Sequence, residues 1–365
     1  MRICYFGGYD RDHPRNRVMI AGLEKCGMEV IECHSRHPSK VIRSILLVAR
    51  YRRVRTRIDV IIVGASCHAY VPIAWVLSRL NRKPLIFDAF VSMYECWEEQ
   101  TTTNWILGLF AFLLDKISAS MSDVVLLDTE EHVTYFCDTF GFSNAKVRSI
   151  PVGAYCDMRL PAKTDHRASP FKVVFAGSFL PLHGADVIIQ AAELLKDDLD
   201  IIIELIGDGE ERSQLEHSCN VSNVVFKKPV PYREYLCILS QFDVALGAFG
   251  ATPKAARVVP CKVYDALMAG VPLITAATPA VSRLLCNRLN AVLIPPRDPI
   301  ALAKEIRTLK ENPALRRLLA QEGRRTFVEI GRPEMVGQRV RCICEEVIAR
   351  MKKQSASGRY EARSK

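Results

Sequence analysis

Three cations and one carboxylate lie close together around the start of a helical pattern in the second half of the chain. Lys254, Arg257 and Lys262 fall within nine positions on a loop, and Asp265 follows one turn later on the same face as Lys262. A helix N-terminus is already an anion site, because its N–H groups are free and its dipole is positive there. Three added cations suit a diphosphate. The alternative is an ordinary amphipathic helix with a local lysine–aspartate pair.

Two glycine turns precede this loop, and each joins an apolar run to a helical pattern. Their residues are Gly177, Ser178, His183 and Gly184 in the first turn, and Gly207 and Asp208 in the second. Glycines at such turns let a phosphate approach the backbone N–H groups of the next helix. Both turns could line a nucleotide pocket, although the second could also turn tightly without any ligand.

Polar residues also follow apolar runs in the first half. Gly7 and Gly8 follow the first run but lack the G-x-G-x-x-G spacing of a dinucleotide site, and a tight turn explains them equally well. Asp88 follows another run, where a carboxylate could bind a hydroxyl, act as a base, or cap a turn. Asp128 is also placed after a strand, but it or Thr129 makes a good helix N-cap, so we favour a structural role there.

The roles considered above require each polar residue to lie where a strand ends and a helix begins. The hydropathy pattern predicts such strands and helices. In the first half we expect strands at 3–6, 29–33, 59–63, 85–87, 124–127 and 146–150, with helices at 16–26, 39–53, 71–80, 104–120 and 131–140. In the second half we expect strands at 172–176, 200–206, 223–226, 244–247, 273–275 and 291–294, with helices at 185–195, 210–217, 232–239, 261–269, 279–285, 299–310, 313–330 and 333–352. Alternation of this kind predicts parallel sheets joined by right-handed crossovers.

The length of 365 residues is too great for one typical core. Residues 151–170 are rich in turn formers and show no periodicity, which is typical of a linker. We therefore predict an α/β protein with two Rossmann-like domains, at 1–160 and 170–330. A C-terminal helix over 331–352 and a disordered tail over 353–365 follow.

Charge and cysteine content limit the partners and the compartment. The net charge is +10, which predicts an anionic partner. The segment Arg43–Arg57 holds six arginines and no acid, so it could lie on an anionic membrane, or be a packed helix with a solvated basic end. Thirteen cysteines without paired spacing fit a reducing cytosol. No apolar run is long enough to span a bilayer, and the first residues lack the features of a signal peptide.

Four segments of the second half resemble the donor-binding half of family-4 retaining glycosyltransferases. They are Val174-Phe-Ala-Gly-Ser with His183-Gly, Ile206-Gly-Asp-Gly-Glu, Pro260-Cys-Lys-Val-Tyr-Asp-Ala-Leu-Met-Ala-Gly-Val-Pro, and Asn290-Ala-Val-Leu-Ile-Pro-Pro-Arg-Asp-Pro. A looser likeness in the first half rests on Gly7-Gly8, Pro84-Leu-Ile-Phe-Asp-Ala-Phe, Asp128-Thr-Glu and Pro151-Val-Gly-Ala. The resemblance implies the GT-B fold, in which two Rossmann-like domains with parallel sheets face across a cleft. It also implies that the C-terminal helix crosses back to the first domain.

The activity implied by this resemblance is transfer of a hexose from a UDP- or GDP-sugar to a hydroxyl acceptor, with retained anomeric configuration. Cations and glycine-turn amides would hold the diphosphate, and Asp265 matches the family's ribose-binding glutamate. The donor-binding residues would be Gly177, Ser178, His183, Gly184, Gly207, Asp208, Lys254, Arg257, Lys262, Val263, Tyr264 and Asp265. The catalytic candidates are Asp88, Arg257 and Lys262, and the acceptor-binding candidates are Gly7, Gly8, Asp88 and Asp128.

Three positions depart from the family pattern. Ser178 stands where the family often has arginine, and His183 stands where it often has lysine. Arg257 replaces the first acid of the family's Glu-x7-Glu motif. We expect that the diphosphate clamp has moved to the loop that carries Lys254, Arg257 and Lys262.

Two other functions remain open at this point. A nucleotide-sugar epimerase also uses two facing Rossmann domains but needs carboxylates near the anomeric carbon, and a non-catalytic sugar-nucleotide binding protein would explain the missing arginine and lysine. No metal or other cofactor is indicated, because no His/Asp cluster has ligand spacing. The acceptor would be lipid-linked or a cell-surface polysaccharide precursor, and not nucleic acid. We expect a cytoplasmic protein, peripheral on the inner face of the membrane through Arg43–Arg57.

Overall fold

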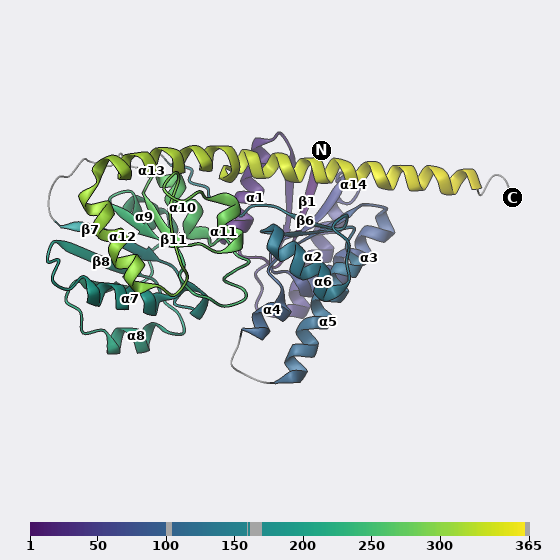
Figure 1. Cartoon of the computed structure of the whole chain (residues 1–365). Coiled ribbons are helices and arrows are strands. Elements are labelled where there is room, and N and C mark those ends of the chain that lie inside the picture. Colours follow the sequence, from purple (N-terminus) through teal and green to yellow (C-terminus); the bar gives the residue numbers. More distant parts are fainter. Residues whose placement is uncertain (100–103, 159, 161–169, 362–365) are drawn as a thin grey trace. The chain divides into compact units, whose positions relative to one another are not determined.

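The computed structural model describes residues 1–99, 104–158, 160 and 170–361 (Figure 1). The chain forms two compact units, unit 1 with Met1–Tyr155 and Arg332–Lys365, and unit 2 with Cys156–Gly331. Each unit has one six-stranded parallel sheet and its own apolar core. The predicted α/β class with two Rossmann-like parallel sheets is confirmed.

The sheet of unit 1 has the strand order β2-β1-β3-β4-β5-β6. Its strands are β1 (Arg2–Gly7), β2 (Glu29–His34), β3 (Val60–Val63), β4 (Leu85–Phe90), β5 (Val124–Leu127) and β6 (Val147–Ser149). Its helices are α1 (Pro14–Lys25), α2 (Lys40–Val54), η1 (His68–Tyr70), α3 (Val71–Asn81), α4 (Met93–Glu98), α5 (Trp105–Met121), α6 (Glu130–Phe140) and α14 (Pro333–Glu361). The first crossover runs one way along the sheet and all later ones run the other way. Right-handed connections therefore place α1 on one face and α2, α3, α5 and α6 on the opposite face.

Helix α14 belongs to unit 1 because it packs along α1 (Figure 1). A Cβ atom added to Gly337 would lie 2.1 Å from the carbonyl oxygen of Gly22, so only glycine lets the two backbones approach this closely. An ion pair of 2.8 Å between Lys25 and Glu334 adds to the contact. We expected a disordered tail over 353–365, but the helix continues to Glu361, since residues 353–361 contain no proline to stop it. Residues 362–365 lie outside the described residues.

The sheet of unit 2 has the strand order β12-β11-β10-β7-β8-β9. Its strands are β7 (Phe171–Ala176), β8 (Ile201–Ile206), β9 (Val224–Lys227), β10 (Val244–Leu246), β11 (Leu273–Ala276) and β12 (Val292–Ile294). Its helices are η2 (Pro181–His183), α7 (Ala185–Leu194), α8 (Arg212–Ser218), α9 (Tyr232–Leu239), α10 (Cys261–Ala269), α11 (Pro279–Leu284), α12 (Pro299–Glu311), α13 (Pro313–Thr326) and the π-helical turn η3 (Phe327–Gly331). The helix expected over 313–330 thus ends at Thr326, and a π-helical turn follows it.

Candidate functional site

The first turn of α10 places a buried ammonium group beside a glycine turn. Pro260 precedes the helix, and Gly270 ends it in the left-handed conformation. The Lys262 side chain points inward, with Nζ 3.8 Å from the centre of the Phe175 ring and only 8% of the residue exposed. A Cβ atom on Gly177 would lie 2.8 Å from this nitrogen, so the glycine makes room for it.

The amino group of Lys262 is held out of water. Its Nζ atom has no hydrogen-bond partner within the described part of the chain. Burial lowers its pKa from 10.5 to about 7, against opposing effects of Cys261 and Asp265. Burying an ammonium that has no hydrogen-bond partner among the described residues is unfavourable for the folded protein, even over an aromatic ring, so this position calls for a functional explanation.

His183 lies in the same cluster and is neutral at ordinary pH. Burial is the main cause of the fall in its pKa to about 3, and the nearby charges of Lys262 and Lys254 add to it. Its Nδ1 atom lies 2.5 Å from the Ser178 carbonyl oxygen, so Nδ1–H donates and Nε2 keeps its lone pair. The structure thus brings Lys254, Lys262 and His183 together, as expected for one anion site. His183 supplies a hydrogen-bonding group there, and the two lysines supply the charge.

Asp265 lies one turn after Lys262 and is almost fully buried. Tyr232, at the start of α9, donates a hydrogen bond to its Oδ1 atom. Sequence reasoning did not find Tyr232, because no spacing rule connects it with a helix that begins so much later in the chain. We expected the neighbours Val263 and Tyr264 to bind the donor, but both side chains lie in the core, and the Val263 N–H is bonded to the Pro260 carbonyl.

The two glycine turns pack against each other at the ends of β7 and β8. Gly177 and Gly207 have φ values of 149° and 145°, and a Cβ atom on Gly207 would lie 1.9 Å from the Gly177 carbonyl oxygen. Gly184 starts α7 in the left-handed conformation, and Ser178 is exposed beside it. The Asp208 carboxylate accepts a 2.8 Å bond from the N–H of Gly209, so it stabilises its own turn. That contact does not favour the donor-binding role that we expected for Asp208.

Arg257 is on the same turn as Lys254, and its N–H donates to the Lys254 carbonyl over 2.9 Å. Both side chains are half-buried. The two residues, which are close in sequence, therefore lie on one compact turn before α10, as expected.

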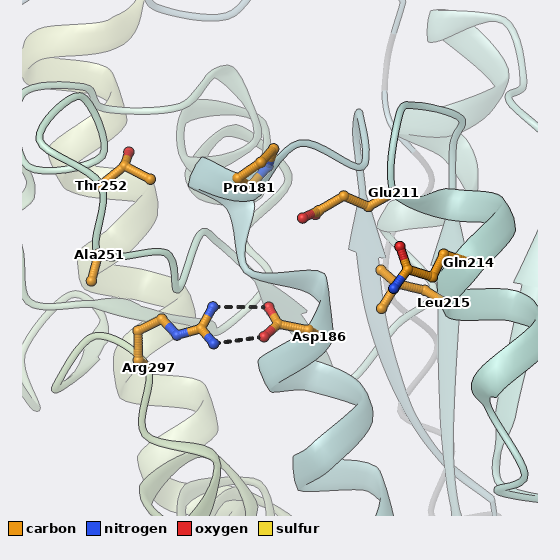
Figure 2. Close-up of a pocket in the computed structure, with 8 residues that line it drawn as sticks. All are labelled: Pro181, Asp186, Glu211, Gln214, Leu215, Ala251, Thr252 and Arg297. Carbon is orange, nitrogen blue, oxygen red and sulfur yellow. Dashed lines mark hydrogen bonds and ion pairs between the residues drawn. The ribbon is translucent and has the colours of Figure 1, made fainter. Parts of the chain in front are cut away.

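A cavity of about 450 Å³ lies elsewhere at the loops of unit 2, lined by α7, α8 and the segments after β10 and β12 (Figure 2). Figure 2 shows two dashed contacts between Arg297 and Asp186, and the shorter one measures 2.9 Å. Burial, then Asp186 and Glu210, raise the pKa of Glu211 on the opposite wall. None of the predicted donor residues lines this cavity. The only signal in the sequence was Arg297, within a segment that resembles the family.

The structure contradicts the catalytic and acceptor-binding roles expected for Asp88. The residue is 0% exposed, and both of its carboxylate oxygens bond to Arg15, at 2.9 Å from Nε to Oδ2 and 3.0 Å from Nη2 to Oδ1. Arg15 also donates to the carbonyls of Ile150 and Pro151. Asp88 lies within β4 and not after it, and its ion pair with Arg15 joins β4 to α1 instead of facing a substrate.

The N-cap of α6 is Thr129, one of the two residues expected there, and Asp128 has an internal partner instead. His132 contacts Asp128 through Nδ1 and Glu95 through Nε2, the latter at 2.8 Å, and all three side chains are buried. The two carboxylates raise the pKa of His132 to about 10 despite its burial. Asp128 therefore belongs to a buried imidazolium cluster that joins β5, α6 and α4.

This cluster predicts a pH-dependent stability difference. The folded pKa of His132 lies near 10, and the ordinary value is 6.5, so its stabilising effect is complete below pH 6.5 and disappears as the pH rises through 10. Urea unfolding of His132→Gln should show a deficit against wild type that shrinks by about 3 kcal/mol from pH 6 to pH 9. A constant deficit would mean that the imidazole is neutral in the fold.

The turn at Gly7 and Gly8 is contacted by Arg43 of α2, which the sequence analysis placed in the basic segment Arg43–Arg57. Arg43 donates from Nε to the His37 carbonyl over 2.8 Å and from Nη1 to the Tyr70 hydroxyl over 3.0 Å. A Cβ atom on Gly8 would lie 2.8 Å from the Arg43 Cδ atom. Arg43 thus lies at the carboxyl edge of the sheet of unit 1, and it does not join the exposed basic end of α2.

Comparison with known proteins places the second half of the chain in a family. Residues 158–326 match the family model described as glycosyl transferases group 1. The D-inositol 3-phosphate glycosyltransferase of Xylanimonas cellulosilytica is 26% identical over 230 residues, which are 58% of this chain and 52% of that protein. The chain spans about half the length of the curated relatives it matches, from 41% to 62%.

Solved structures show the fold of the whole chain. Sucrose-phosphate synthase from Thermosynechococcus elongatus superposes with a TM-score of 0.74 at 14% identity, over 96% of this chain and 99% of that one. Anabaena Alr3699/HepE in complex with UDP-glucose gives a TM-score of 0.68 at 14% identity, over 95% and 100%. The predicted resemblance is confirmed: residues 158–326 form a group 1 glycosyltransferase domain, and the chain has the GT-B fold.

Proposed function

We propose that this protein is a retaining hexosyltransferase that uses a UDP- or GDP-sugar as donor and a hydroxyl group as acceptor. The observation that carries the proposal is Lys262, a buried cation without a hydrogen-bond partner among the described residues, beside the Gly177 turn and the start of α10. A bound diphosphate would give this ammonium its missing partner. The group 1 match over residues 158–326, and a structural neighbour that holds UDP-glucose, support the choice of donor.

The chemistry then follows from where charge develops. The bond between the anomeric carbon and the diphosphate oxygen breaks, and its electron pair stays on the diphosphate. The acceptor oxygen bonds to the same face of that carbon, and its proton moves to the departing phosphate oxygen. Lys262 and Lys254 stabilise the charge on the leaving group, so no carboxylate base is required. Because Asp88 is bonded to Arg15, the structure offers less support for an epimerase than the sequence did.

The first experiment incubates the protein with a panel of UDP- and GDP-sugars and follows the donor by mass spectrometry and NMR. Slow release of the diphosphate with an α-configured sugar product from α-configured donors supports the proposal. Recovery of an isomerised donor would indicate an epimerase. Binding of donors without any turnover, even with a pool of candidate acceptors, would indicate a binding protein.

Asp265 is the proposed ligand of the donor ribose, and Tyr232 orients it. Asp265→Asn should weaken UDP binding by roughly tenfold, since a neutral amide accepts hydrogen bonds less strongly than a carboxylate. Calorimetry with UDP measures this effect. The matched control is 2′,3′-dideoxy-UDP, which lacks the ribose hydroxyls and should bind wild type and variant equally. An equal loss of affinity for both ligands would show that Asp265 does not bind the ribose hydroxyls.

The acceptor side of the proposal is a lipid-linked hydroxyl compound or a surface-polysaccharide precursor at the cytoplasmic face of an anionic membrane. Arg50, Arg52, Arg53, Arg55 and Arg57 are exposed at the end of α2, and no ion pair involves them within residues 1–99, 104–158, 160 and 170–361. Such a cluster is attracted to anionic lipid. The thirteen cysteines are free, which fits a reducing compartment.

A further inference from the structure

Helix α5 presents an apolar face to the outside of unit 1. Trp105 and Phe110 are 69% and 63% exposed, and Ile106, Leu109, Leu113 and Ile117 are also exposed. These positions recur at helical spacing, so they form one face. The one acid of the helix, Asp115, is on the buried side, where its Oδ2 atom accepts bonds from Ser92 Oγ and the Tyr94 N–H. A surface helix usually buries its apolar side chains and exposes its charged ones, whereas α5 exposes apolar side chains and buries its acid.

Helix α2 is on the same face of the sheet of unit 1 as α5. Its first half exposes Val41, Ile42, Ile45 and Leu46, and its sequence contains no acid. Helices in this fold run from the carboxyl edge of the sheet towards the amino edge. The apolar half of α2 is thus at the carboxyl edge, as is the start of α5, while the arginines of α2 are at the amino edge. Monomeric proteins rarely expose apolar patches beyond a few hundred Å² without a function.

We infer that the outer face of α5, together with the apolar start of α2, inserts into the surface of an anionic phospholipid bilayer. Among the described residues, no helix has the length and apolar content to cross a bilayer, so α5 would lie in the plane of the interface. Tryptophan, phenylalanine and leucine are typical of the apolar face of such interfacial helices. This inference rests on the membrane association in the proposed function. The arginines would attract the protein to anionic lipid, and the apolar side chains of α5 would bind the bilayer in a way that salt does not weaken.

Charge argues against a second copy of the chain as the occupant. A two-fold interface brings the same patch of both copies together. The second copy's patch would offer no acid to the arginines of α2, which form no ion pair among the described residues, because α2 has no acid and the one acid of α5 is buried. An anionic lipid bilayer would bury the apolar face of α5 and also attract the arginines of α2. It would also bring a lipid-anchored acceptor to the carboxyl edge, where Gly8 and Arg43 lie.

The test is flotation with phosphatidylcholine vesicles that contain phosphatidylglycerol. The triple variant Ile106→Gln, Phe110→Gln, Leu113→Gln should partition about a hundredfold more weakly than wild type. The wild-type protein, once bound, should stay on the vesicles at about 1 M NaCl, where the Debye length is about 3 Å. The matched control is Leu199→Gln with Ile300→Gln in unit 2, which alters side chains that are 87% and 71% exposed and should not change binding. Circular dichroism checks that every variant is folded.

Trp105 provides a second readout. Its fluorescence should shift to shorter wavelength on vesicles and be quenched by brominated lipid, and Trp105→Phe should remove both signals. Equal flotation of the triple variant and wild type would overturn the inference, as would a wild-type dimer that only the triple variant dissociates. Donor hydrolysis without vesicles should be the same in the triple variant and wild type. Vesicle binding by a protein with no transferase activity would therefore refute the proposed function alone.

Discussion

Lys262→Met is expected to bind UDP at least about a hundredfold more weakly than wild type, and yet to be more stable. The loss of binding follows from removing the buried cation that the diphosphate would contact. The gain in stability follows from the lowered pKa of the lysine, because burial moves it from 10.5 to about 7. At pH 7 this corresponds to roughly 4 kcal/mol of unfolding free energy that an apolar side chain of similar length would recover.

The sign of this effect can be checked against pH. Between pH 7 and 10.5 the unfolded chain binds a proton on Lys262 that the folded protein does not, so wild-type stability rises with pH over this range relative to the variant. The stability gap should therefore be largest below pH 7 and should nearly close at about pH 10. Urea unfolding at both values measures it, and calorimetry measures UDP binding.

Lys304→Met is the matched control, since Lys304 is an exposed lysine of α12 and its replacement should alter neither property. Lys254→Ala and Arg257→Ala then show how far the clamp extends along the loop. Unchanged UDP affinity in Lys262→Met would refute the diphosphate role, and a less stable variant would show that the ammonium has a partner in the protein.

Periodicity made the fold predictable, because buried parallel strands form continuous apolar runs between amphipathic helices. β3 consists of Val-Ile-Ile-Val, fully buried, and was expected within one residue of its place. The start of α10 was predictable for a similar local reason, since Pro260 and Gly270 mark its ends. The π-helical turn at Phe327–Gly331 was not, because its residues continue the helical pattern without a break.

The site was predictable only where its contacts are local in sequence. Lys254 and Lys262 could be grouped by spacing, and the structure brings both to His183. Tyr232 and Arg43 reach their sites from other elements, and only the fold shows this. The same limit explains the error at Asp88: the strand was expected to end at Phe87 but runs to Phe90, and the partner of Asp88, Arg15, comes from 73 residues earlier.

Asp88→Asn is expected to lower the free energy of unfolding by about 4 kcal/mol, because it leaves the Arg15 guanidinium buried without a counter-charge. Both side chains are almost fully inaccessible, so water cannot replace the lost carboxylate. UDP binding should be unchanged under conditions where the variant is folded, since Asp88 belongs to unit 1 and Lys262 to unit 2. Urea unfolding and calorimetry measure the two effects. A catalytic Asp88 would give the reverse pattern, with lost turnover and little lost stability.

A double variant separates loss of a charge pair from loss of packing. Arg15→Met with Asp88→Leu removes both charges and keeps an apolar side chain at each position, and such replacements of buried pairs are often neutral or stabilising. The double variant should therefore recover most of the stability that Asp88→Asn loses. The carbonyls of Ile150 and Pro151 also lose their donor when Arg15 is replaced, so recovery should be incomplete by about 1–3 kcal/mol. A double variant less stable than Asp88→Asn would show that the contacts of Arg15 with those carbonyls contribute more to stability than its pairing with Asp88.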